Sequence, residues 1–90
     1  MLSITVSKLY KKQFKKLSKA EQLAINEVVK TLSSGETLDP KFKDHDLKLN
    51  FAGFRECHIK PNLLLIYQIK NEILELYLAS TGSHQEVFSW

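Results

Sequence analysis

The spacing of apolar residues changes once in the first third of the chain, which predicts one strand followed by helices. Residues 2–6 alternate apolar and polar side chains, as a half-buried β-strand does. From Ser7 onwards, Tyr10, Phe14 and Leu17 recur at helical spacing while lysines occupy another face. This segment therefore predicts an amphipathic helix with one apolar and one basic stripe.

A second helix is predicted to begin at Ser18. Ser18 and Glu21 have the spacing of a capping box, in which each side chain bonds the backbone amide of the other residue. Apolar residues then recur over residues 23–32, and Gly35 can adopt the left-handed conformation that ends a helix. Because the two helices are joined by a short turn, we expect an antiparallel helical hairpin.

The second half of the chain predicts an antiparallel meander. Residues 35–53 show no clear period and predict a long connection, which in so small a domain is often functional. Strands are predicted at residues 54–59, at the apolar run 63–69, which is typical of a central strand, and at residues 73–79. Turns are predicted at residues 61–62 and 71–72, and a short last strand at residues 86–88.

The order of these elements indicates one α+β domain spanning residues 1–90. It has an N-terminal strand and a two-helix hairpin packed on one face of an antiparallel β-sheet. Hydrophobic residues make up 43% of the chain, which is ordinary for a globular domain.

Neither a membrane segment nor an export signal is indicated. No apolar run approaches the roughly 20 residues that cross a bilayer, and residues 1–6 lack the basic and hydrophobic regions of a signal peptide. Cys57 is the only cysteine, so no internal disulfide can form. We therefore expect a cytoplasmic protein without a membrane partner.

Charge is distributed unevenly along the chain. Residues 1–20 contain six lysines and no acidic residue, whereas the other seventy residues contain seven basic and ten acidic ones. A segregated positive charge favours a polyanionic partner such as RNA or DNA. The alternative is a solvated helix face whose lysines only keep the protein soluble.

Three histidines, His45, His58 and His84, lie near expected strand ends, and antiparallel pairing could bring them together. Cleavage of RNA by its own 2′-hydroxyl needs a base, an acid and a cation for the charge on phosphorus. Histidine can serve as base or acid near neutral pH, Arg55 can bind a phosphate, and Phe88 can stack on a base. Each histidine could instead have only a structural role in its loop or strand.

Zinc binding is the alternative chemistry for these histidines. Their spacings of 13 and 26 residues match no compact ligand pattern, and Cys57 is expected to face away from His58. The sequence therefore predicts no metal and no organic cofactor.

Three segments of the chain resemble the YafQ branch of the RelE/ParE toxin superfamily. They are Lys43-Asp44-His45 with Leu47, Phe54-Arg55-Glu56 with His58 and the strand after it, and Thr81-Gly82-Ser83-His84 with Val87-Phe88. The three segments follow in the same order and at compatible spacing, so the resemblance covers nearly the whole chain.

The resemblance implies the toxin of a bacterial type II toxin–antitoxin pair, an mRNA interferase that cuts mRNA on the bacterial ribosome without a cofactor. It also implies a cognate antitoxin, through which alone the toxin would reach operator DNA. By position, the catalytic residues would be His45, His58, His84, Phe88 and Asn62. The residues that bind RNA or phosphate would be Arg55, Lys43, Lys48, Lys60, Lys8, Lys11, Lys12 and Lys15.

The chain departs from the family pattern at four positions. Asn62 replaces an aspartate, Ser80 an arginine, Leu49 a glycine and Asp46 a proline. Two alternatives therefore stay open besides the nuclease. One is a catalytically weak relative that binds the ribosome or its antitoxin, and the other is a ParE-like gyrase inhibitor, which would not need the three histidines.

Overall fold

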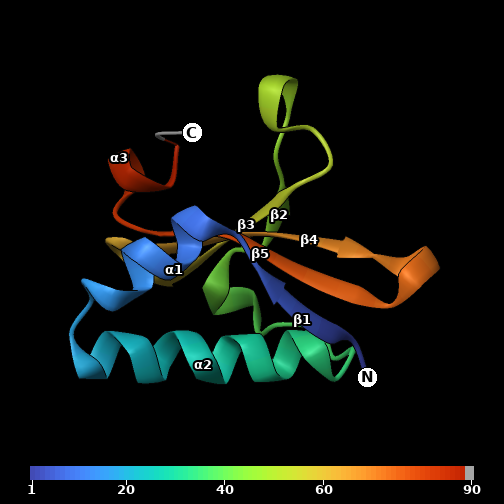
Figure 1. The fold of residues 1–90 in the computed structure, drawn as a ribbon, viewed down its shortest axis with the longest axis horizontal. Helices are drawn as coiled ribbons and strands as arrows, with labels where there is room; N and C mark the ends of the chain where they lie inside the picture. The colour runs from blue at the N-terminus through green and yellow to red at the C-terminus, as the bar shows by residue number, and fades with distance from the viewer. Residues whose placement is uncertain (89–90) are drawn as a thin grey trace.

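A five-stranded sheet forms the centre of the computed structural model, which describes residues 1–88 (Figure 1). The strands follow the order β1-β5-β4-β3-β2 across the sheet. Their bounds are Ser3–Val6 for β1, His45–Asp46 for β2, Arg55–Lys60 for β3, Leu63–Lys70 for β4 and Glu75–Gly82 for β5. The predicted α+β class is confirmed.

Strands β2 to β5 pair antiparallel with one another, as the predicted meander requires. Strand β1 differs, because it pairs parallel with β5, with Ser3 opposite Glu75 and Val6 opposite Leu78. The sequence predicted the direction of the meander strands only and left the pairing of the N-terminal strand open. The period of a strand predicts which side chains share a face, but it does not contain the direction of the neighbouring strand.

Helices α1 (Lys8–Lys15) and α2 (Lys19–Ser33) lie on one face of the sheet (Figure 1). The predicted capping box at α2 is present, with Glu21 N–H donating to Ser18 Oγ at 3.2 Å and Ser18 N–H donating to Glu21 Oε1 at 3.0 Å. Gly35, with φ +85°, follows the helix as predicted. None of the described helices is long and apolar enough to cross a membrane.

The larger hydrophobic core lies between these two helices and the sheet, and we call this side the covered face. Its buried residues are Tyr10, Ile25, Val28, Val29, Leu32, Leu38, Cys57, Leu63, Leu65, Tyr67, Leu76 and Leu78. Full burial of one such aliphatic side chain stabilises the fold by about 1.5–3 kcal/mol.

A smaller core lies on the opposite side of the sheet, which we call the open face. Its buried residues are Leu64, Ile66, Ala79 and Val87. Val87 belongs to the one-turn helix α3 (His84–Val87), where the sequence had predicted a short strand. That prediction was wrong because Ser83 and Glu86 form a second capping box, the same signal that correctly placed α2.

The long connection contains three short elements. They are the 3₁₀ turns Pro40–Phe42 and Leu49–Phe51 and, between them, strand β2. Two residues are too few to show a period, so the sequence could not reveal β2. The predicted turn at residues 61–62 joins β3 and β4, whereas a 3₁₀ turn at Asn71–Ile73 delays the start of β5 to Glu75.

Candidate functional site

Pairing between β2 and β3 brings two of the three histidines onto one carboxylate. His45 in β2 lies opposite Glu56 in β3, and His58 follows two residues later, on the same side of the strand. Glu56 Oε1 is 3.3 Å from Nε2 of His45 and 3.3 Å from Nε2 of His58. We call these three residues the His–Glu–His cluster.

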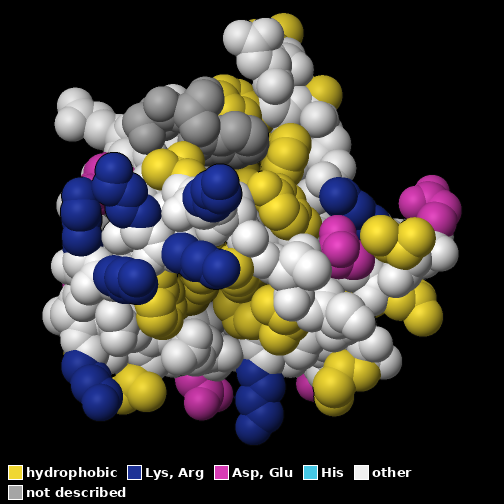
Figure 2. Space-filling model, in the orientation of Figure 1, with side chains coloured by type: hydrophobic (Ala, Val, Ile, Leu, Met, Phe, Trp, Pro, Cys, Tyr) yellow, Lys and Arg dark blue, Asp and Glu magenta, His cyan; other side chains and the backbone are white. Residues whose placement is uncertain are grey.

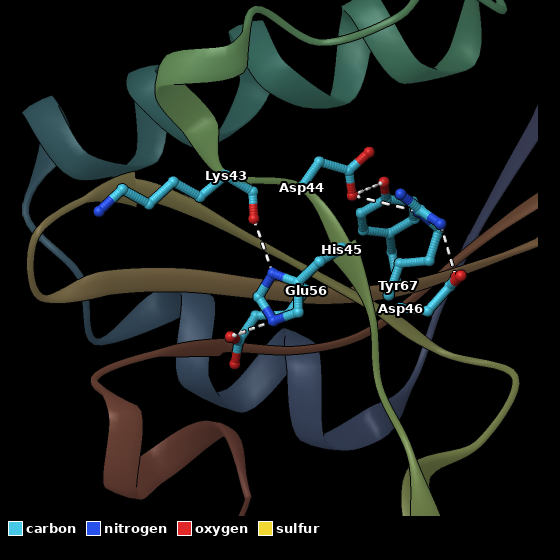
Figure 3. Close-up of polar contacts among 7 residues, drawn as sticks. Lys43, Asp44, His45, Asp46, Glu56 and Tyr67 are labelled. Atoms are coloured by element: carbon cyan, nitrogen blue, oxygen red, sulfur yellow. Dashed lines mark hydrogen bonds and ion pairs between the residues drawn. The ribbon is translucent and has the colours of Figure 1, made fainter.

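The geometry determines which nitrogen of His45 carries a hydrogen. His45 Nδ1 lies 2.7 Å from the carbonyl oxygen of Lys43, on the side of the ring opposite Glu56 (Figure 3). A carbonyl oxygen only accepts, so Nδ1 must donate and Nε2 faces the carboxylate. A stable contact there needs a proton or another cation between the nitrogen and the oxygen.

Glu56 is the site residue that the sequence interpretation missed. Its side chain is only 5% exposed, and its Oε2 atom has no hydrogen-bond partner among the described residues. Burial of a carboxylate without full hydrogen bonding is costly, which makes Glu56 a candidate for a functional group. The available signal was an acidic residue in the middle of a strand, on the same face as His58.

The third histidine lies on the same face of the sheet as the cluster. Glu56 and His58 are directly opposite Ile66 and Leu64 of β4, and these two pack against α3. His84 begins α3 and is exposed. The structure thus joins His45 to His58 and places His84 on the element that covers the neighbouring part of the open face.

Aromatic side chains accompany His84. Its ring centroid is 5.4 Å from that of Phe88, and Phe88 is in turn 5.0 Å from Phe51, both in edge-to-face geometry. Phe88 is half-buried, so part of its ring is accessible beside the histidine. An accessible aromatic ring next to an exposed imidazole suits the stacking of a nucleobase.

Arg55 does not join these residues. Its Nε lies 3.2 Å from Asp44 Oδ1 and its Nη1 lies 2.5 Å from Asp46 Oδ1, while the Tyr67 hydroxyl also donates to Asp44 (Figure 3). The hydrogen bond with Asp44 raises the pKa of the guanidinium, and burial raises the pKa of Tyr67. Arg55 thus pairs with two carboxylates on the side of β3 opposite His58, and its phosphate-binding role stays a prediction.

A basic groove lies beside the cluster. Its volume is about 520 Å³, and its lining comprises Lys41, Phe42, Lys43, His58, Ile59, Lys60 and Pro61. Two of the predicted RNA-binding lysines therefore lie next to His58. Asn62 is exposed in the adjoining β3–β4 turn, and Lys48 is exposed in the loop after β2.

The remaining predicted lysines form a stripe along α1. Lys8, Lys11, Lys12 and Lys15 are all exposed, and basic side chains gather over this helix (Figure 2). A second groove, lined by Leu9, Lys12, Gln13, Lys16, Gln85 and Glu86, connects the stripe to α3. The lysines of α1 and the helix that bears His84 are thus neighbours.

The His–Glu–His cluster also has the donors for a metal ion. One ligand atom from each of the three residues lies within 4.8 Å of the others. The two nitrogen–oxygen separations of 3.3 Å match a tetrahedron edge of about 3.4 Å that bonds of about 2.1 Å would give. The spacing of the histidines along the chain argued against a metal site, because it cannot show that His45 and Glu56 lie opposite each other on paired strands. Cys57 lies in the core of the covered face, as predicted, and burial raises its pKa to about 12.

The fold and the site define a small α+β protein that carries a histidine–carboxylate centre on the open face of its sheet. The family model described as "Bacterial toxin of type II toxin-antitoxin system, YafQ" matches residues 2–89. The chain therefore belongs to the YafQ family of type II toxin–antitoxin toxins, as the resemblance predicted.

Known relatives agree with this assignment. The mRNA interferase toxin YafQ of Escherichia coli (strain K12) is 31% identical over 81 residues, which cover 90% of this chain and 82% of that protein. A metal-bound toxin from Helicobacter pylori is 42% identical, with a TM-score of 0.85 and coverage of 98% and 100%. The toxin in the E. coli DinJ–YafQ toxin–antitoxin complex is 26% identical, with a TM-score of 0.82 and coverage of 98% of both chains.

Proposed function

We propose that this protein is a ribosome-dependent mRNA endonuclease, an mRNA interferase, whose acid and base are supplied by the His–Glu–His cluster and His84. The observation that carries the proposal is the single Glu56 oxygen 3.3 Å from two imidazole nitrogens. The name of the E. coli relative, an mRNA interferase toxin, supports the same reaction class.

The reaction forms one bond at phosphorus and breaks another. The 2′-oxygen attacks the adjacent phosphorus and gives its proton to a base, and the bond to the 5′-oxygen breaks as that oxygen receives a proton from an acid. The products are a 2′,3′-cyclic phosphate and a 5′-hydroxyl. An imidazole can perform either transfer near neutral pH, so the reaction runs without a metal.

Binding of the RNA is assigned to the lysines and to Phe88. The lysine stripe of α1 would bind phosphates of the ribosome-bound RNA, and Lys43 and Lys60 would hold the scissile phosphate beside His58. These two lysines would supply the cation that is lost where Ser80 replaces the arginine of the family pattern. Phe88 would stack on a base next to the cleaved bond.

The partners follow from the same assignment. A cognate antitoxin would bind and inhibit this protein, as the DinJ–YafQ complex exemplifies for the E. coli toxin. Operator DNA would be bound only through that antitoxin. A ribosomal target also places the active protein in the cytoplasm.

The test is primer extension on a defined mRNA in a cell-free translation reaction with purified protein. Discrete cuts are expected only on translated message, and His58→Ala and His84→Ala should each reduce cutting about 100-fold while keeping the fold. Lys12→Glu should weaken cutting, whereas Lys30→Glu on α2 is the matched control outside the stripe. Intact message with arrested translation would instead identify a binding module, and unaffected translation would contradict both.

A substrate with sulfur in place of the 5′-bridging oxygen distinguishes the acid from the base. Sulfur leaves without protonation, so a variant that lacks only the acid should cut this substrate as fast as the unaltered protein. A variant that lacks the base should stay slow. Equal defects of His58→Ala and His84→Ala on the sulfur substrate would contradict a division of roles between these two residues.

We also propose that the cluster binds Zn²⁺ or Cu²⁺. Two imidazoles and a carboxylate suit either ion, and the similar H. pylori toxin is described as metal-bound. A metal would occupy the nitrogen and oxygen atoms that exchange protons, so Zn²⁺ should inhibit cleavage and a chelator should restore it. Calorimetric titration with Zn²⁺ should show one site that His45→Ala removes and that Asp46→Ala keeps. Unchanged binding in His45→Ala would contradict the site.

A further inference from the structure

Helix α3 depends on contacts with the rest of the protein. It contains only four residues, far fewer than an isolated helix needs to be stable in water. Its last residue, Val87, is fully buried, and the buried Ser80 hydroxyl donates to the Val87 carbonyl oxygen at 2.9 Å. An arginine at position 80, as in the family pattern, would not fit here unless α3 moved.

Gln13 of α1 holds the same segment from the other side. The backbone N–H of Thr81 donates to Gln13 Oε1 at 2.9 Å, and Gln13 Nε2 donates to the carbonyl oxygen of Glu86 at 2.9 Å. The partners fix the orientation of the amide, because an N–H must meet its oxygen and a carbonyl must meet its nitrogen. One side chain thus connects the end of β5 to the end of α3.

Further hydrogen bonds attach both Thr81 and helix α1, which carries Gln13, to the sheet. Thr81 is fully buried, and its hydroxyl donates to the Leu64 carbonyl oxygen at 2.8 Å. The N-cap of α1 is attached to the sheet as well, since the Ser7 hydroxyl donates to the Ala79 carbonyl oxygen at 2.6 Å. Through Gln13, the position of α3, which carries His84, therefore depends on the positions of the sheet and of α1.

We propose that Gln13 is a positioning residue for His84, and this inference rests on the function proposed above. By holding α3 against α1, Gln13 sets where His84 and Phe88 lie relative to the lysine stripe. Both of its hydrogen bonds go to backbone groups, those of Thr81 and Glu86, so Gln13 would act through the position of α3. Loss of the bridge should therefore slow the cleavage step about tenfold, because small displacements of a catalytic group are costly, and leave the affinity for the ribosome unchanged.

The kinetic test is single-turnover cleavage on mRNA-programmed ribosomes at increasing toxin concentration. Gln13→Ala removes both hydrogen bonds, and Gln13→Glu keeps the acceptor for Thr81 but turns an oxygen toward the Glu86 carbonyl. Both variants should lower the maximal rate about tenfold with an unchanged half-saturating concentration.

Gln22→Ala is the matched control. Gln22 also donates its side-chain amide to a backbone carbonyl, that of Phe14 at 2.8 Å, but it connects α2 to α1 away from α3. Its removal should lower the stability of the fold about as much as Gln13→Ala does and should keep the maximal rate within about twofold. A rate loss in Gln22→Ala equal to that in Gln13→Ala would overturn the inference.

Amide exchange of Val87 tests the bridge without any cleavage assay. This N–H donates to the Ser83 carbonyl oxygen within α3, so it reports whether the helix opens. Its exchange should be about tenfold faster in both Gln13 variants and unchanged in Gln22→Ala. If the unaltered protein cuts no mRNA, the proposed function fails and Val87 still decides whether Gln13 holds α3. Unchanged exchange in Gln13→Ala, or an altered half-saturating concentration alone, would overturn the inference.

Discussion

The two faces of the sheet use the same strands for different purposes. On the covered face, α1 and α2 bury a continuous apolar core, whereas the open face has a small core, one short helix and the His–Glu–His cluster. Strand β3 shows the division residue by residue, since Cys57 is fully buried in the larger core while Glu56 and His58 on either side of it face the site. Burial of apolar side chains on the covered face therefore offsets the free-energy cost of the buried Glu56 carboxylate on the open face.

Two neighbouring leucines of β4 lie on opposite faces of the sheet. Leu65 belongs to the covered face and Leu64 to the open face, and both are almost fully buried. We expect Leu65→Ala to lower the free energy of unfolding by about 3–5 kcal/mol and Leu64→Ala by about 2 kcal/mol, because α3 can settle into the smaller void. Urea denaturation measures both values. An equal loss in the two variants would contradict the unequal division of stability.

The second test removes the charge of the cluster. Glu56→Gln should reduce mRNA cleavage about 100-fold, since the carboxylate that contacts both imidazoles at 3.3 Å is lost. Its free energy of unfolding should stay equal or rise, because the variant no longer buries a carboxylate with an unbonded oxygen. Glu75→Gln, which affects only the contact with Lys70 at 3.4 Å, is the control and should cleave normally. A large loss of stability in Glu56→Gln would show that the cluster supports the fold.

The third test concerns the aspartates that hold Arg55. Asp44 accepts from both Arg55 and the buried Tyr67 hydroxyl, whereas the Asp46 side chain is 75% exposed. Asp44→Ala should cost about 1–3 kcal/mol of folding free energy because it leaves the buried hydroxyl without its acceptor. Asp46→Ala should cost less than about 0.5 kcal/mol. Thermal unfolding of the two variants provides the comparison, and equal melting temperatures would contradict a structural role for Asp44.

The two capping boxes should differ slightly in how they respond to acid. Hydrogen bonds from Ser18 and Ser83 lower the pKa of Glu21 and Glu86 below the ordinary value of 4.5. A carboxylate with a lowered pKa stabilises the fold above its ordinary pKa, and this contribution disappears as the pH falls through the lowered value. Below about pH 4.5 the four-residue α3 should therefore lose helical Cα chemical shifts while α2, held by the covered face, keeps them. Loss of both helices at the same pH would show that the faces are equally stable.

Local signals predicted much of the covered face. The stripe of Tyr10 and Phe14, the Ser18 capping box and the apolar run of β4 each follow from residues close in sequence. The open face depends on pairings between distant segments, so its parts were predicted only in fragments. The histidines were recognised as candidates, yet β2 and the position of Glu56 beside both imidazoles appear only when β2 pairs with β3.

The error at α3 had another physical cause. The Ser83–Glu86 capping box was present in the sequence, but the apolar residues Val87 and Phe88 were interpreted by strand period instead. The phosphate-binding role predicted for Arg55 rests on its charge and stays a prediction, and its pairing with Asp44, eleven residues away, could not be read from the sequence. A charged side chain can be assigned a ligand from sequence only when its partners within the fold are known.

The parallel pairing of β1 with β5 has a consequence for how the protein is made. The first strand finds its partner about 70 residues later in the chain, and the Ser7–Ala79 hydrogen bond spans 72 positions. During synthesis, the sheet therefore cannot close, and α1 cannot meet α3, until the residues of β5 and α3 have left the ribosome. A nascent chain that ends before β5 lacks the assembled open face, so the site forms only after translation has passed α3.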